Sequence, residues 1–182
     1  MRVYTRKGDD GTTGLLYGGR VAKDSALPVA YGTVDEAQAF LGLARAEAAH
    51  DGELDRLLVR LERELWVAMA ELATDPANHA KLTPGQSRVT PEMVAGLEAT
   101  IDDLSARFEM PTEFVVPGQN RLAALLDVAR TVVRRAERAA LGAPRPDGSE
   151  VLAYLNRLSD LLWTMARWQE GADVLPTRSA TS

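Results

Sequence analysis

Four charged residues, Asp127, Arg130, Arg134 and Glu137, follow one another at intervals of three, four and three residues. This spacing places all four on one face of a helix. Two arginines four residues apart repel each other weakly, but their guanidinium groups suit a phosphate or carboxylate placed over both. The pattern therefore indicates an anion site, and the alternative is a solvated helix face with Glu137 as its internal counter-charge.

The glycine-rich stretch at residues 8–14 (GDDGTTG) is a second place where an anion could be held. Glycines let backbone N–H groups approach a ligand closely, and threonine hydroxyls together with Lys7 and Lys23 add further donors. The stretch is neither a Walker A loop nor a Rossmann fingerprint, because its glycine and lysine spacing fits neither pattern. A plain structural turn explains these glycines equally well when they are taken alone.

Polar residues in the last apolar stretch also share a face, because Asn156 and Asp160 are four residues apart beside a stripe of leucines. A buried asparagine there would need hydrogen-bond partners, and the alternative is a bundle helix with a polar edge. No Ser/His/Asp set is readable. The chain has no cysteine, and its two histidines, His50 and His79, stand far apart. These facts exclude a thiolate site and argue against a histidine metal site.

Composition narrows the class of protein. The 182 residues are 46% hydrophobic and only 5% aromatic, and abundant Ala, Leu, Arg and Glu favour helices over a β-sandwich. A formal net charge of −5 argues against a general nucleic-acid binder. The first residues lack the apolar core of a signal peptide, and no long uncharged apolar run follows. We therefore expect a cytoplasmic protein that binds neither nucleic acid nor membrane.

Five amphipathic stretches must position the polar residues. Apolar residues at helical spacing predict helices over residues 33–50, 53–74, 90–108, 120–141 and 148–172. Thr33 and Glu36 have the spacing of a capping box, so we expect the first helix to begin at Thr33. The expected fold is all-α, a five-helix bundle with a glycine-rich N-terminal arm.

We expect a single domain over residues 1–182, and its remaining segments are irregular. We expect residues 1–32 to form the glycine-rich arm, with a short strand at 2–5, and the helical bundle to occupy 33–172. Residues 76–89 predict an exposed, mobile connection, and 173–182 predict a tail.

Five segments of the sequence resemble the PduO-type ATP:cob(I)alamin adenosyltransferases. They are residues 4–14 (YTRKGDDGTTG), 31–36 (YGTVDE), 114–118 (FVVPG), 129–138 (ARTVVRRAER) and 154–160 (YLNRLSD). The likeness runs from about residue 3 to residue 170, nearly the whole chain. Five motifs in the right order and at the right intervals are far more specific than any one of them.

The resemblance implies an enzyme that transfers the adenosyl group of ATP to the cobalt of cob(I)alamin, giving adenosylcobalamin and triphosphate. It also implies a homotrimer with ATP at subunit boundaries, Mg²⁺ carried by the ATP and an electron-donating reductase. The family is further implicated in handing its product to an adenosylcobalamin-dependent mutase. The alternative with the same fold is a non-catalytic sensor or chaperone that binds nucleotide or corrinoid.

The resemblance also assigns residues by position. It gives ATP binding to a set from the arm and the last two helices: Thr5, Arg6, Lys7, Gly8, Thr13, Gly14, Lys23, Arg134, Arg135, Glu137, Arg138 and Asn156. Asp35 and Arg130 would form an ion pair near the corrinoid, and Phe114 would fill the lower axial side of cobalt. These three residues and Arg134 are the expected catalytic group.

Two positions depart from the family pattern. Lys7 stands where the family commonly has a small hydroxyl residue, which affects the fine ATP contacts. Gln119 and Asn120 follow the FVVPG motif where Gly-Ser or Gly-Thr is usual, which affects the corrinoid pocket. The implied chemistry still agrees with the residues present, because cob(I)alamin is itself a strong nucleophile. No protein base or nucleophile is needed, only alignment and stabilisation of the leaving triphosphate.

Overall fold

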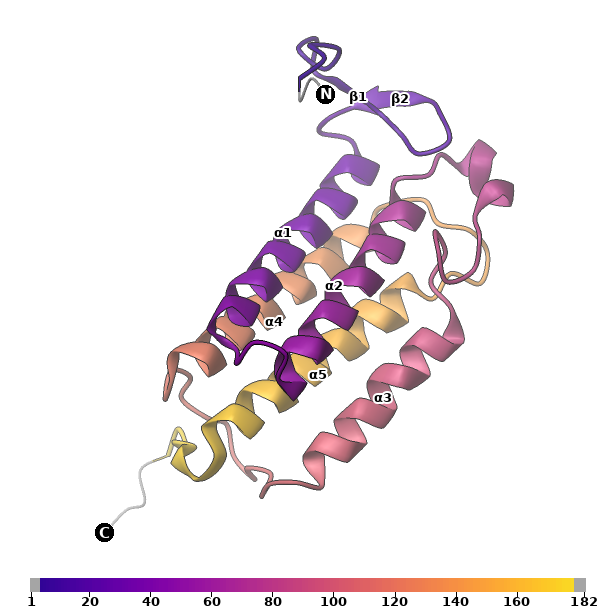
Figure 1. Cartoon of the computed structure of the whole chain (residues 1–182). Helices are drawn as coiled ribbons and strands as arrows, with labels where there is room; N and C mark the ends of the chain where they lie inside the picture. Colours follow the sequence, from indigo (N-terminus) through magenta and orange to yellow (C-terminus); the bar gives the residue numbers. More distant parts are fainter. Residues whose placement is uncertain (1–3, 179–182) are drawn as a thin grey trace.

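The computed structural model describes residues 4–178 as five long helices with a small hairpin at the N-terminal end (Figure 1). The helices are α1 (Ala26–Glu47), α2 (Glu53–Leu72), α3 (Pro91–Ser105), α4 (Arg121–Leu141) and α5 (Val151–Glu170). Short 3₁₀ turns follow α2 and α5 at η1 (Pro76–Lys81) and η2 (Gly171–Asp173). The prediction of an all-α, five-helix bundle with a glycine-rich arm is confirmed.

The hairpin lies in the arm. Strand β1 (Thr12–Gly14) pairs antiparallel with β2 (Arg20–Ala22), and Thr13 stands opposite Val21. The strand expected at 2–5 falls partly outside the described residues, and Tyr4 and Thr5 form no strand.

The core of the bundle lies between α1, α4 and α5, with α2 against α1 and α3 against α5. Alanine recurs every seven residues along α1 at Ala30, Ala37 and Ala44, and all three are fully buried. Buried alanines also line α4, its main neighbour, at Ala129 and Ala136. Small side chains at such positions let two helix backbones approach closely. This close pairing fixes which face of α4 turns outward.

The first helix begins seven residues earlier than expected. Ser25 occupies the N-cap position of α1, and Pro28 lies in the first turn, where a missing backbone N–H costs nothing. Thr33 is therefore inside the helix, and its hydroxyl donates to the Val29 carbonyl at 2.7 Å. The predicted capping box with Glu36 is wrong, and the arm ends at Ser25 rather than at residue 32.

The other helices follow the expected spans more closely, although α3 ends at Ser105 and not near 108. Two of them have side-chain caps, since Thr90 Oγ1 accepts from Met93 N–H and Asn120 Oδ1 accepts from Ala123 N–H at 2.8 Å. Asn120, which departs from the family pattern, thus still supplies a helix cap.

Two segments expected to be loose are held by hydrogen bonds. In the connection 76–89, Val89 is buried and its N–H donates to Glu71 Oε2 at 2.6 Å. In the tail, Thr177 N–H donates to the Phe114 carbonyl and Val116 N–H to the Leu175 carbonyl, each at 2.8 Å. Backbone pairing of this kind does not depend on side-chain type, so residue patterns do not reveal it. Residues 179–182 of the expected tail lie outside the described part of the chain.

None of the described helices combines the length and apolar character that crossing a membrane requires.

Candidate functional site

The arm is built around a turn at residues 6–11 that leads into the hairpin. A Cβ added at Gly8 would lie 3.1 Å from the Thr12 carbonyl oxygen and 3.2 Å from Lys23 Nζ, so a side chain there would force a shift. The same proximity places the Lys23 ammonium beside the Gly8 backbone. Two predicted ATP-binding residues therefore lie together in the arm.

Arg20 holds the turn together, although its type and spacing had not singled it out. Its Nη2 donates to the Lys7 carbonyl and to Thr12 Oγ1, each at 2.5 Å. Asp10 in turn accepts from the Thr12 hydroxyl at 2.7 Å and from its N–H at 2.9 Å, and these bonds lower the pKa of the Asp10 carboxyl. Arg20 reaches the turn only because the hairpin register places it opposite Gly14.

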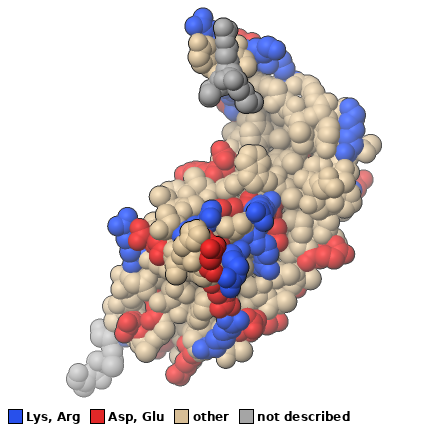
Figure 2. Space-filling view, viewed as in Figure 1, with Lys and Arg blue, Asp and Glu red and all other residues tan. Residues whose placement is uncertain are grey.

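The loop between β1 and β2 is hydrogen-bonded to the bundle, and the rest of the arm projects beyond the bundle. Leu16 N–H donates to the Ala73 carbonyl at 2.9 Å, and the Tyr17 hydroxyl lies 3.1 Å from Ser87 Oγ. The residues before the hairpin extend past the helix ends, with a hollow beneath them in the space-filling view (Figure 2).

The second half of the predicted ATP set lies on α4 and α5. Asn156 Nδ2 on α5 donates to Glu137 Oε1 on α4 at 3.1 Å. Arg138 Nη1 donates to the Arg134 carbonyl at 3.0 Å, and Arg135 forms an ion pair with Glu36 on α1. Arg134 itself is exposed, and its side chain makes no ion pair within the described residues. Its guanidinium is therefore available to an anion.

The expected ion pair between Asp35 and Arg130 does not form within this chain. Arg130 Nε lies 3.0 Å from Asp127 Oδ1, one helical turn earlier on α4. Asp127 Oδ2 also accepts from Arg167 Nη2 at 2.5 Å. Asp35 faces elsewhere, into a mostly apolar hollow of ≈ 390 Å³ that Trp66 of α2 also lines. Sequence reasoning missed Arg167, because it stands among the apolar residues of α5.

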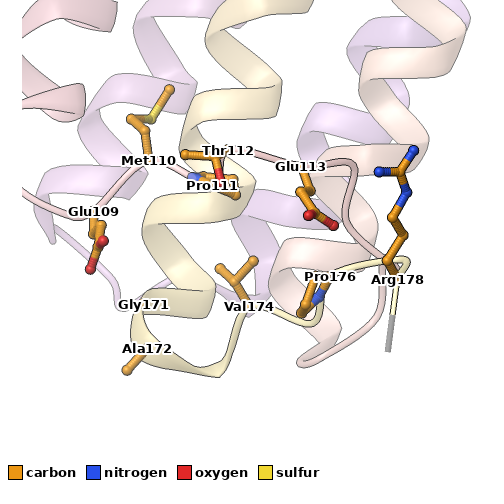
Figure 3. A pocket seen from close by; sticks show the side chains of 10 residues that line it. All are labelled: Glu109, Met110, Pro111, Thr112, Glu113, Gly171, Ala172, Val174, Pro176 and Arg178. Carbon is orange, nitrogen blue, oxygen red and sulfur yellow. The ribbon is translucent and has the colours of Figure 1, made fainter. Parts of the chain in front are cut away.

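Phe114 belongs to the link between α3 and α4, which lies at the end of the bundle opposite the arm (Figure 1), and the residue is 87% exposed. It borders a hollow of ≈ 450 Å³ together with Trp163 and Arg178. The adjoining hollow, of ≈ 640 Å³, lies between the link at residues 109–113 and the segment after α5 (Figure 3). Within one chain, Phe114 is thus separate from both groups of predicted ATP-binding residues.

The described residues contain no cluster of three or more His, Cys, Asp or Glu side chains that could hold a metal ion. On the face seen in Figure 2, basic and acidic side chains lie close together in the middle and lower part of the view, while the upper right is largely uncharged. Among the exposed arginines of α4, Arg134 forms no ion pair within the described residues, so it and the donors of the arm are suited to an anion.

Comparison with known proteins adds a family to this geometry. The sequence model of cobalamin adenosyltransferases matches residues 3–169. The chain belongs to the cobalamin adenosyltransferase family. This member is 43% identical over 185 aligned positions to the corrinoid adenosyltransferase of Mycobacterium tuberculosis, with 94% of this chain and 95% of the relative covered. It is 38% identical to that of Bacillus subtilis, with 92% of this chain and 86% of the relative covered.

Solved structures agree with the family. A variant PduO-type ATP:corrinoid adenosyltransferase from Lactobacillus reuteri, with histidine in place of a phenylalanine, was solved with cobalamin and ATP. It superposes on this adenosyltransferase with a TM-score of 0.85 at 27% identity, covering 99% of this chain and 98% of the other. An arginine-to-lysine variant of the same enzyme, solved with ATP, gives a TM-score of 0.83 at 26% identity, covering 97% and 100%.

Proposed function

We propose that this cobalamin adenosyltransferase transfers the 5′-deoxyadenosyl group of ATP to the cobalt of cob(I)alamin. The observation that carries the proposal is the family match over residues 3–169, together with the likeness to a structure solved with cobalamin and ATP. The products are adenosylcobalamin and triphosphate.

The reaction is a displacement at carbon. The electron pair of cob(I)alamin forms the cobalt–carbon bond to the 5′ carbon, and the bond from that carbon to the triphosphate oxygen breaks. The leaving triphosphate takes the electron pair of the broken carbon–oxygen bond, and its oxygens share the resulting negative charge. The protein needs to align the two substrates and stabilise the leaving group, and no general base is required.

The proposed nucleotide site combines donors of the arm with the polar face of α4 and α5. Arg134 is the best candidate to hold the leaving triphosphate, because it is exposed and its side chain has no carboxylate partner in the described chain. Glu137 and Asn156 bond to each other and form a rigid neighbour for the nucleotide. Mg²⁺ would arrive with the ATP, whose phosphate oxygens are suitable ligands.

We propose that the complete site forms between subunits of a homotrimer. The arm projects from its own bundle, and Asp35 and Arg130 do not meet within one chain. Large apolar side chains are exposed on three helices, including Val29, Trp66 and Val128. Association would cover them and would let Asp35 pair with Arg130 of the partner subunit. Light scattering should give three times the 19.7 kDa mass of the chain.

The main test follows the absorbance of reduced cobalamin with Mg-ATP under anaerobic conditions, with and without the protein. We expect protein-dependent formation of the cobalt–carbon species together with released triphosphate. Binding of both substrates without transfer would instead support the sensor or chaperone function. In cells, cob(I)alamin must be supplied by a reductase, and we expect a cytoplasmic reductase and an adenosylcobalamin-dependent mutase on either side of this step.

Replacing Arg130 with alanine should impair corrinoid positioning more than ATP affinity. Arg130 lies one helical turn from Arg134 on α4 and, unlike Arg134, pairs with a carboxylate of this chain, that of Asp127. We expect the KM for cob(I)alamin to rise while the KM for ATP changes little, measured by varying one substrate at a time. A large rise in the ATP constant with unchanged corrinoid kinetics would contradict this role.

Phe114→Ala should let a lower axial ligand return to cobalt and slow its reduction. Phenylalanine is apolar, bulky and unable to coordinate cobalt. Phe114 is 87% exposed, so its ring is accessible to a bound corrinoid. The measurement is the absorption spectrum of bound cob(II)alamin, with Phe114→Leu as an apolar control. A bound spectrum that alanine does not change would argue against the assignment.

A further inference from the structure

A buried network of four charged side chains joins α4 to α5. Asp127, Arg167 and Glu170 are 6%, 1% and 4% exposed, whereas the Arg130 side chain is 29% exposed. Asp127 lies between two guanidinium groups, with Oδ1 3.0 Å from Arg130 Nε and Oδ2 2.5 Å from Arg167 Nη2. The network holds two positive and two negative formal charges, and only Arg130 reaches toward solvent.

Arg167 is the most constrained member of this network. Its Nη2 donates to Glu170 Oε1 at 3.1 Å as well as to Asp127. Its Nε lies 2.7 Å from Glu170 Oε2, but the angle does not allow a hydrogen bond, and among the described residues neither of these two buried atoms has a hydrogen-bond partner. Its guanidinium also lies over the Trp163 ring, 5.7 Å from the centroid. A guanidinium presents its donors in a rigid planar fork, so Arg167 held by Glu170 offers Asp127 a donor in one fixed place.

Arg130 contacts the network through Asp127. Asp127 is its ion-pair partner within the described residues, and one carboxylate oxygen contacts its Nε. Because Asp127 shares its charge with Arg167, Arg130 keeps positive charge available for another anionic group. A buried charge network also carries a desolvation cost, and apolar residues of similar size are often as stable. Stability alone therefore does not explain an arginine at position 167.

We propose that Arg167, acting through Asp127, is a positioning residue for Arg130 and thereby for the corrinoid. The inference rests on the proposed function, in which Arg130 lies near the corrinoid. Arg167 is buried and cannot touch a substrate itself. Its effect on the reaction therefore runs through the orientation of Arg130, and ATP binding should not depend on it.

Arg167→Lys tests the inference, because lysine keeps the charge but loses the planar guanidinium, whose Nη2 donates to both Asp127 and Glu170. We expect the KM for cob(I)alamin to rise by about 10- to 100-fold, the range seen when groups that orient a first contact are removed. The KM for ATP should stay unchanged. In a crystal structure of the variant, Arg130 should have left Asp127. The matched control is Arg157→Lys, which alters an α5 arginine that pairs with Glu98 and Asp160 on an accessible face.

A double-mutant cycle separates positioning from a merely structural role. In the Arg130→Ala background, Arg167→Lys should add no further change in the corrinoid KM. Effects that multiply would overturn the inference, and so would a crystal structure in which Arg130 stays on Asp127. If Arg130→Ala leaves the corrinoid KM unchanged, the proposed role of Arg130 fails separately. Should Arg167→Lys fail to fold, Glu170→Gln weakens the hold on Arg167 at equal volume, and the same readings apply.

Discussion

Arg134→Ala should lower kcat by about 10²- to 10³-fold, the loss typical when one donor to developing charge is removed. Arg134 is exposed and has no carboxylate partner within the described chain, so its guanidinium is available to the triphosphate. The leaving triphosphate gains charge as the carbon–oxygen bond breaks, and a guanidinium fork matches its oxygens. The measurement is the steady-state rate of adenosylcobalamin formation at saturating ATP.

Arg63→Ala is the matched control, because Arg63 is an exposed arginine on α2 with no place in the proposed site. It should keep the wild-type rate. Arg134→Lys should recover part of kcat, since it restores the charge without the fork. A wild-type kcat in Arg134→Ala would remove Arg134 from the mechanism, whatever the ATP affinity of that variant.

Asp127→Ala should lower the free energy of unfolding by about 3–5 kcal/mol, the usual cost of breaking a buried ion pair from one side. The substitution removes one of the two carboxylates that contact Arg167, which is 1% exposed, and leaves Glu170 as its remaining anion. Urea unfolding followed by circular dichroism measures the change. The substitution would also release Arg130, so activity should fall together with stability.

Asp103→Ala provides the comparison for that result. Asp103 forms an i,i+4 ion pair with Arg107 on an accessible face of α3, and such pairs contribute about 0–1 kcal/mol. If both aspartate variants unfold at the same urea concentration, the network of Asp127, Arg167 and Glu170 is not a stabilising unit.

Residue patterns predicted the helices wherever the boundaries were marked by unambiguous breakers or caps. Asp51-Gly52 before α2 and Asn120 before α4 are such markers, and both helices begin where expected. The start of α1 was misplaced because Thr33 and Glu36 imitate a capping box. Pro28 was the available evidence for an earlier start, since proline is tolerated in the first turn of a helix.

The candidate site was predictable only in part. The shared face of α4 follows from helical spacing, whereas the hydrogen bond between Glu137 and Asn156 depends on how α4 and α5 pack together. The partner of Arg130 does not, because Asp35 and Asp127 both carry the right charge and only the packed backbone decides between them. The contacts of Arg20 and Arg167 could not be predicted for a related reason. The register of the hairpin brings Arg20 to its partners, and the rotation of α5 brings Arg167 to its own.

Residues of one family motif can also have different roles in the structure. Within residues 154–160, Asn156 faces Glu137, but the Tyr154 side chain is buried and its hydroxyl donates to Glu64 Oε2 at 2.8 Å. Burial, with the nearby Glu64 carboxylate, raises the pKa of Tyr154 well above its ordinary value. Tyr154 therefore holds α5 against α2, and the position of a residue in a family motif does not by itself make it part of the site.

The peripheral packing of α3 has a consequence for hydrogen exchange. Leu97 and Leu104 are its two buried side chains, and its main neighbour is α5. A helix with so few buried apolar contacts opens at a lower free energy than the α1, α4 and α5 core. Amides of α3 should therefore exchange with solvent before those of α4. Because Arg134 and Asp127 belong to α4, the enzyme can undergo this sub-global opening many times while the face proposed to hold triphosphate remains folded.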